Sequence, residues 1–129
     1  MILHVLRFRF RDDVDERERD DVLADLRRLA AADSVTFSVV GQDVGDPSEG
    51  YTHGYCVAVE DFDALRRYQY HPEHRAIAKR FASRVAALTG LDVSDDTPSD
   101  LSERIRAMFQ AWLADDPELA DLLEALPRA

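Results

Sequence analysis

A helix corner at residues 68–74 is the feature that most constrains the fold of this chain. The segment reads Tyr-Gln-Tyr-His-Pro-Glu-His. Pro72 biases the residue before it away from helical backbone angles, and proline suits the first position of a new helix. The pattern therefore predicts one short helix over residues 62–70 and a second over residues 72–87. In the second helix, apolar residues recur at helical spacing on the same face as His74.

The rest of the chain alternates strand-like and helix-like segments. Asp15 and Glu18 form a capping box at the start of a helix with a buried stripe of leucine and valine. Alternating or apolar runs predict strands over residues 2–10, 35–41, 51–59 and 88–93. The order strand, helix, strand, strand, helix, strand is the ferredoxin-like split βαβ pattern, an α+β fold whose antiparallel sheet carries helices on one face. We expect one such domain over residues 1–93.

A C-terminal helical extension follows this domain. Residues 94–100 are a polar linker that contains Pro98. Beyond it, apolar residues at helical spacing and an Asp-Pro start signal at Asp116 predict two amphipathic helices. We assign residues 94–129 to this linker and extension, and expect the helices to pack on their own domain or on a twin subunit.

The composition excludes several classes of partner. The chain has 129 residues and a net charge of −10, which argues against binding to nucleic acid or to an anionic membrane. No stretch approaches the ~20 apolar residues of a membrane span, and the N-terminus runs directly into a charged strand rather than a signal peptide. The single cysteine, Cys56, excludes an internal disulfide. These features predict a cytoplasmic protein in which Cys56 is a small buried side chain.

Four polar residues are predicted to face the apolar interior. His4 lies on the apolar face of the first strand, His53 shares a face with the apolar residues of the third strand, and Tyr68 and His74 flank the helix corner. Each of them alone is explained as a hydrogen-bonded core residue. Because burying four polar groups is costly, the set together favours a shared pocket. We expect no metal, since the corner separates His71 from His74 and no acidic residue is predicted beside them.

Three separated motifs carry a family resemblance. They are His-Val-Leu-Arg-Phe-Arg-Phe at residues 4–10, Gly-Tyr-Thr-His at 50–53 and Tyr-x-x-His-Pro-x-His at 68–74. In this order and spacing they resemble the Dabb family, the stress-responsive dimeric α/β barrel domains, over residues 2–93. The resemblance implies a homodimer whose two sheets pair into a barrel.

The resemblance also implies an activity. A plant polyketide cyclase of this family closes a linear polyketide by an intramolecular aldol reaction without metal or cofactor. Its pocket residues fall by motif on His4, His53, Tyr68 and His74 of this chain. The expected function is therefore aldol-type cyclisation of a carbonyl-rich poly-β-ketone, with His74 as base, Tyr68 as its hydrogen-bonding partner, and His4 and His53 holding substrate oxygens.

Two alternatives remain open at this point. One is a non-catalytic stress-responsive protein that binds a small hydrophobic ligand or simply dimerises. The other is a cofactor-free monooxygenase of the related dimeric barrel class. The substrate and the ring that is closed do not follow from the sequence.

Overall fold

Strand β1 lies at the centre of the structure. The computed structural model describes residues 1–129, and its four strands form one antiparallel sheet in the order β2-β3-β1-β4. The strands are β1 (Ile2–Phe10), β2 (Val35–Gln42), β3 (His53–Val59) and β4 (Val85–Ser94). The helices are α1 (Glu16–Ala30), α2 (Phe62–Gln69), α3 (His74–Ala82), α4 (Leu101–Ala114) and α5 (Pro117–Glu124), with a short 3₁₀ turn η1 (Pro47–Glu49). This order along the chain and across the sheet confirms the ferredoxin-like α+β fold.

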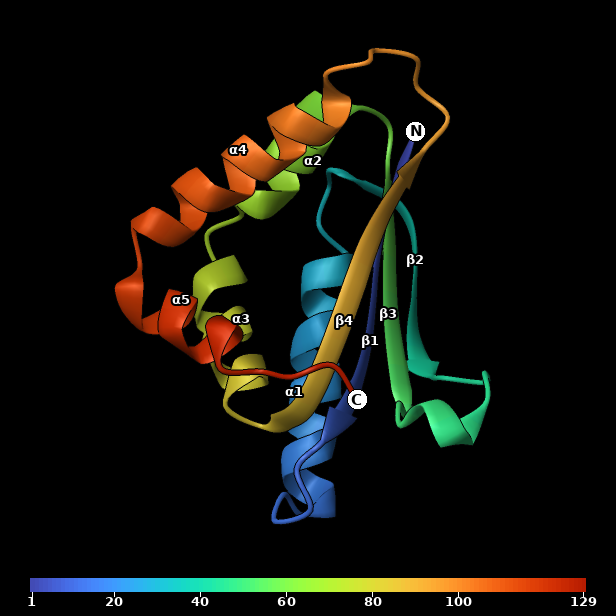
Figure 1. The fold of residues 1–129 in the computed structure, drawn as a ribbon, viewed down its shortest axis with the longest axis vertical. Coiled ribbons are helices and arrows are strands. Elements are labelled where there is room, and N and C mark those ends of the chain that lie inside the picture. Colours follow the sequence, from blue (N-terminus) through green and yellow to red (C-terminus); the bar gives the residue numbers. More distant parts are fainter.

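All five helices lie on one face of the sheet (Figure 1). Helices α1, α2 and α3 pack next to the strands, and the C-terminal helices form an outer layer in which α4 contacts α2 and α5 contacts α3. Asp15, Asp61 and Asp116 cap α1, α2 and α5 by accepting a backbone N–H with their side chains. Such caps satisfy donors that a helix start leaves free, so the sequence determines these three starting points locally.

The helix predicted over residues 72–87 is shorter in the structure. Helix α3 ends at Ala82, and β4 begins at Val85 instead of Leu88. Val85 is buried as predicted, but as a strand residue opposite Phe10 of β1. The prediction was wrong because a short apolar run of alanine, valine and leucine fits a helix or a buried strand equally well. Pairing with β1 decides between the two.

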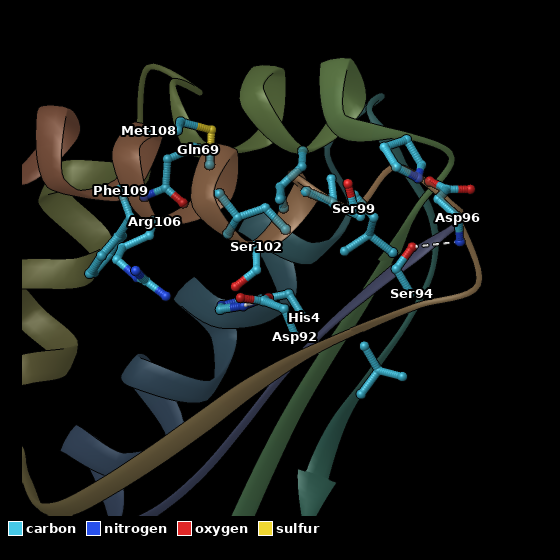
Figure 2. A pocket seen from close by; sticks show the side chains of 16 residues that line it. His4, Gln69, Asp92, Ser94, Asp96, Ser99, Ser102, Arg106, Met108 and Phe109 are labelled. Carbon is cyan, nitrogen blue, oxygen red and sulfur yellow. Dashed lines mark hydrogen bonds and ion pairs between the residues drawn. The ribbon is translucent and has the colours of Figure 1, made fainter.

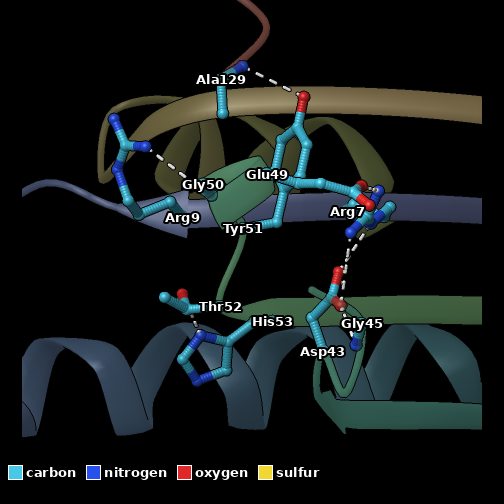
Figure 3. Close-up of polar contacts among 10 residues, drawn as sticks. All are labelled: Arg7, Arg9, Asp43, Gly45, Glu49, Gly50, Tyr51, Thr52, His53 and Ala129. Atoms are coloured by element: carbon cyan, nitrogen blue, oxygen red, sulfur yellow. Dashed lines mark hydrogen bonds and ion pairs between the residues drawn. The ribbon is translucent and has the colours of Figure 1, made fainter. Parts of the chain in front are cut away.

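The loop between β2 and β3 is anchored from β1. Arg7 donates to Asp43 at 2.7 Å and to Glu49 at 2.5 Å, and its guanidinium lies 4.7 Å from the centre of the Tyr51 ring (Figure 3). The Tyr51 hydroxyl accepts the N–H of Ala129, so the end of the chain docks on the same loop. Tyr51 thus lies outside β3, although the predicted strand began at residue 51, and its side chain points away from that of His53 (Figure 3). The regular strand begins only at His53, so the alternation does not extend back to Tyr51.

The other face of the sheet is open and apolar. No helix covers it (Figure 1). Large apolar side chains of both edge strands, β2 and β4, are exposed on it. The exposed fractions are 50% for Phe37, 66% for Val39, 55% for Leu91 and 52% for Val93. Cys56 belongs to this face between them and is only half-buried, so the expectation of a buried cysteine is not met in the single chain. An apolar face of this kind requires cover from outside the chain.

We expect two chains to cover this face for each other in a two-fold symmetric homodimer. Val39→Lys and Leu91→Lys together place charges on both edges of the face and should shift the protein towards monomer. Sedimentation at micromolar concentration measures the change, with a lysine at the already exposed Val44 as control. A wild-type protein that sediments only as monomer contradicts the prediction.

The C-terminal extension builds its own small core against the domain. Trp112 of α4 and Leu119 of α5 are 2% and 0% exposed, and they pack with Ala82 at the end of α3. Leu101 of α4 joins the main core. The extension is therefore packed on the domain of its own chain, which was one of the two predicted arrangements.

Deleting residues 97–129 should lower the melting temperature or the solubility, because it exposes the apolar surface that Trp112 and Leu119 cover. Thermal unfolding of the full and shortened chains, each compared by oligomeric state, measures this effect. An unchanged melting temperature and oligomeric state would mean that the extension is dispensable for stability.

Candidate active site

Two neighbouring hollows, which share part of their walls, lie on the helical side of the sheet. The inner one, which we call the aromatic cavity, has a volume of about 130 Å³. Its wall combines residues from β1, β3, α2, α3 and α4, among them His4, Tyr55, Tyr68, His74, Phe81 and Trp112. The sequence-predicted residues His4, Tyr68 and His74 are thus brought together, although the chain separates them by up to 70 residues.

The outer hollow, which we call the groove, opens between α4 and the paired strands β1 and β4 (Figure 2). Its volume is about 600 Å³. His4, Gln69 and Phe109 line both the groove and the aromatic cavity. These three residues therefore stand at the junction of the two hollows.

His4 forms a pair with Asp92. The two residues lie directly opposite each other on β1 and β4, and His4 Nδ1 is 2.8 Å from Asp92 Oδ1. Because a carboxylate can only accept, Nδ1 carries the proton of this hydrogen bond. The other ring nitrogen, Nε2, is then left with a free lone pair whenever the ring is neutral. This arrangement orients the ring and stabilises the positive charge that the ring gains when it takes a proton.

Two tyrosine hydroxyls meet inside the fold. Tyr55 and Tyr68 are 2% and 1% exposed, and their hydroxyl oxygens are 2.6 Å apart. Burial raises the pKa of both hydroxyls above the ordinary value for tyrosine, so both remain protonated at neutral pH. In such a pair one hydroxyl donates to the other, and the second proton remains available to a ligand. The ring of His4 lies 6.5 Å from that of Tyr55 and 6.2 Å from that of Tyr68.

His74 lies between two aromatic rings at the start of α3. Its ring centre is 5.0 Å from that of Tyr68 and 4.8 Å from that of Trp112. Its Nδ1 donates to the Tyr68 backbone carbonyl at 3.2 Å, so its bond is to the tyrosine backbone and not to the hydroxyl. Burial lowers the pKa of His74 to about 4, which keeps the ring neutral at physiological pH and makes it a weak proton acceptor.

His53 does not reach the aromatic cavity. Its ring stacks on Phe8 at 5.6 Å, and its Nδ1 is 2.8 Å from the Thr52 hydroxyl (Figure 3). Phe8 in turn meets Phe81, which belongs to the cavity wall, so one aromatic ring separates His53 from that wall. Along β1 the partner of His53 is Phe8, four residues or about 13 Å from His4.

Four residues of the site were not predicted as site residues. Asp92 was predicted only as part of the fourth strand, and its pairing with His4 was not foreseen. Tyr55 belongs to the predicted third strand and Trp112 to the predicted C-terminal extension, and neither was assigned to a site. Gln69, the one buried polar residue apart from the tyrosines, ends α2 at the junction. For Asp92 the available signal was its place in the predicted fourth strand. Leu88, Gly90 and Asp92 are each two residues apart and therefore share one face of β4.

No three histidine, cysteine or acidic side chains converge as a metal-binding group in this structure. None of the helices combines the length and the apolar character that crossing a bilayer would need.

Comparison with known families agrees with this architecture. Residues 2–95 match the family model described as Stress responsive A/B Barrel Domain, or Dabb. The chain belongs to the Dabb family. The match ends before α4, so the groove wall made by α4 and the Trp112 side of the cavity lie outside the region that defines the family.

Solved structures show the same fold. A dimeric ferredoxin-like protein of unknown function from Thermobifida fusca is 28% identical, with 72% of this chain and 89% of that chain covered and a TM-score of 0.64. A Dabb family protein from Mesorhizobium loti is 24% identical, with coverages of 74% and 97% and a TM-score of 0.66. A hydroxynitrile lyase from Passiflora edulis is 21% identical, with coverages of 75% and 96% and a TM-score of 0.65. No curated protein matches the sequence.

The lowered pKa of His74 predicts acid sensitivity. The folded state holds this ring neutral down to about pH 4, whereas the unfolded chain protonates it near pH 6.5. The unfolded state therefore binds more protons between these two values, and stability falls as pH falls, by about 1.4 kcal/mol per pH unit from this residue. His74→Gln should show a correspondingly smaller loss. Urea unfolding of both proteins at several pH values measures the difference, and equal pH dependence contradicts the prediction.

Proposed function

We propose that this protein is a cofactor-independent enzyme that catalyses intramolecular aldol-type cyclisation of a poly-β-ketone. The observation that carries the proposal is that His4, which is paired with Asp92, lines one aromatic cavity together with the hydrogen-bonded tyrosines Tyr55 and Tyr68. An aldol reaction needs a base for an acidic C–H and a donor for an oxygen that becomes negative. The two pairs are suited to these two tasks.

His4 is the base in this proposal. Its Nε2 takes a proton from a carbon between two carbonyl groups, while Asp92 accepts the Nδ1–H and stabilises the imidazolium. The resulting enolate carbon attacks a carbonyl carbon farther along the same chain. The alkoxide formed there takes the proton back from His4, so the step is balanced without another reactant. The role of base thus moves from His74, whose lowered pKa suits it less, to His4.

The tyrosine pair supplies the donor. Because burial keeps both hydroxyls protonated, the pair donates a hydrogen bond to the enolate oxygen and later to the alkoxide. The donors are held by the fold before substrate arrives, since Tyr55 comes from β3 and Tyr68 from α2. His74, with its Nδ1 bound to backbone, orients substrate through its remaining ring nitrogen.

The size of the cavity supports closure of a single ring. A protein cavity of about 150 Å³ takes one benzene molecule, and this cavity measures about 130 Å³. The groove of about 600 Å³ falls within the range of small-molecule sites and receives the rest of the chain. The aromatic wall excludes water, which strengthens the polar interactions inside.

A second candidate is a binding protein for a small hydrophobic ligand without turnover. The apolar lining of the aromatic cavity favours it, because most wall residues there are aliphatic or aromatic. The similarity to the Passiflora hydroxynitrile lyase supports the fold and, at 21% identity, does not select a reaction. Turnover itself distinguishes the two candidates.

The test is cyclisation of linear poly-β-ketones, as thioesters and as free acids, measured against the spontaneous rate. His4→Ala should lower the rate by about 10²- to 10⁴-fold, the usual contribution of a general base. Tyr68→Phe should reduce the rate while leaving substrate binding, because it removes only a hydroxyl. His71→Ala, a half-buried histidine outside the cavity, is the matched control and should keep the wild-type rate.

Two results would change the conclusion. A wild-type rate equal to the spontaneous rate on every poly-β-ketone tested would favour the second candidate, a protein that binds a ligand without turnover. A large loss in His74→Ala, with none in His4→Ala, would return the role of base to His74.

A further inference from the structure

One basic side chain enters the groove without a partner. Arg106 of α4 is the only lysine or arginine in the groove wall, in a chain with a net charge of −10. In Figure 2 its guanidinium points into the space between α4 and β4, on the side of α4 that carries Ser102 and faces His4, and no hydrogen bond or ion pair within the groove reaches it. Its side chain is exposed, and neither acidic residue of the groove wall, Asp92 or Asp96, is its partner.

The two acidic residues of the groove are already engaged. Asp92 accepts from His4 at 2.8 Å, and Asp96 accepts from the Met1 amino group at 3.0 Å. An unpaired guanidinium keeps its donors for an external anion, whose binding works against the negative charge of Asp92, since a neutral His4 ring does not cancel that charge. An acidic protein repels anions over most of its surface, so such binding depends on this one side chain.

The position of Arg106 limits how far the anion lies from the reaction. Arg106 precedes Phe109, which stands at the junction of groove and cavity, by three residues on the same helix face. One helical turn spans about 5 Å along the axis. An anionic group held by Arg106 is therefore only a few bonds from atoms that lie in the aromatic cavity.

We propose that Arg106 binds a carboxylate of the substrate, and that the substrate class is a keto acid whose carboxylate lies a few bonds from the ring-forming carbons. This inference rests on the proposed function for the nature of the reacting end. Arg106 comes from the extension beyond the family match, so this selectivity belongs to this chain and not to the shared domain. A phosphate on a distant carrier arm fits the short spacing less well.

Binding of simple probes tests the proposal without requiring turnover. Hydrocinnamate places a phenyl ring and a carboxylate at the required spacing, and hydrocinnamamide is its neutral counterpart of nearly equal shape. Calorimetry gives the two affinities. Trp112, the only tryptophan and part of the cavity wall, reports by its fluorescence that the phenyl ring occupies the cavity.

Wild type should bind the acid about tenfold more tightly than the amide, as one charge-assisted bidentate contact allows. Arg106→Met should abolish this preference by weakening the acid alone. The matched control is Arg104→Met, because Arg104 lies on the same helix but stacks on Phe62 at 4.3 Å, outside the groove wall. It should keep the wild-type preference.

Three outcomes overturn the proposal: no acid preference in wild type, including absence of binding; a preference that survives in Arg106→Met; or tighter binding of phenethyl phosphate through Arg106, which would assign the site to phosphate. Failure of the proposed function has a different signature. In that case the acid preference and its dependence on Arg106 persist, while no poly-β-ketone is turned over.

Discussion

The antiparallel pairing of β1 with β4 is the interaction on which the rest of the site depends. It sets the register that places His4 opposite Asp92, and in an antiparallel pair opposite residues share one face of the sheet. A shift of one residue would turn His4 to the open face and leave Asp92 without its partner. The same strand pairs with β3 on its other side, and this second pairing brings Tyr55 to the same region of the sheet.

The buried polar groups of the site are held by hydrogen bonds to one another or to backbone, and some of their hydrogen-bonding positions stay unused. The Tyr55 and Tyr68 hydroxyls satisfy each other, and His74 satisfies one nitrogen on a backbone carbonyl. Each group therefore avoids most of the cost of an unpaired buried polar atom. Each also keeps one unused hydrogen-bonding position, which is the condition for recognising a polar ligand in an apolar cavity.

The C-terminal extension changes what the shared domain can bind. Without α4 the aromatic cavity would lack Trp112 and Phe109, and the groove would lose one wall. The domain provides His4, Tyr55 and Tyr68 from β1, β3 and α2, while the extension provides one wall of the groove.

The sequence by itself determined the order of elements, the helix caps and the helix corner, because these depend on neighbours within a few residues. Pro72 separates α2 from α3, which begins two residues later at His74, and Asp15 caps its helix through the N–H of Glu18. The alternation in β1 likewise placed His4 on the helical face. The family motifs selected Tyr68 and His74, which the structure brings to the same cavity as His4.

Only the tertiary structure decided which of these residues meet. His53 and Tyr55 lie on the same face of one strand, yet the register with β1 puts Tyr55 beside the cavity and His53 behind Phe8. Asp92 and Trp112 join the site through a strand pairing and a helix packing between segments far apart in sequence. Local patterns carry no information on such contacts, because strand register and helix docking depend on the whole core being packed at once.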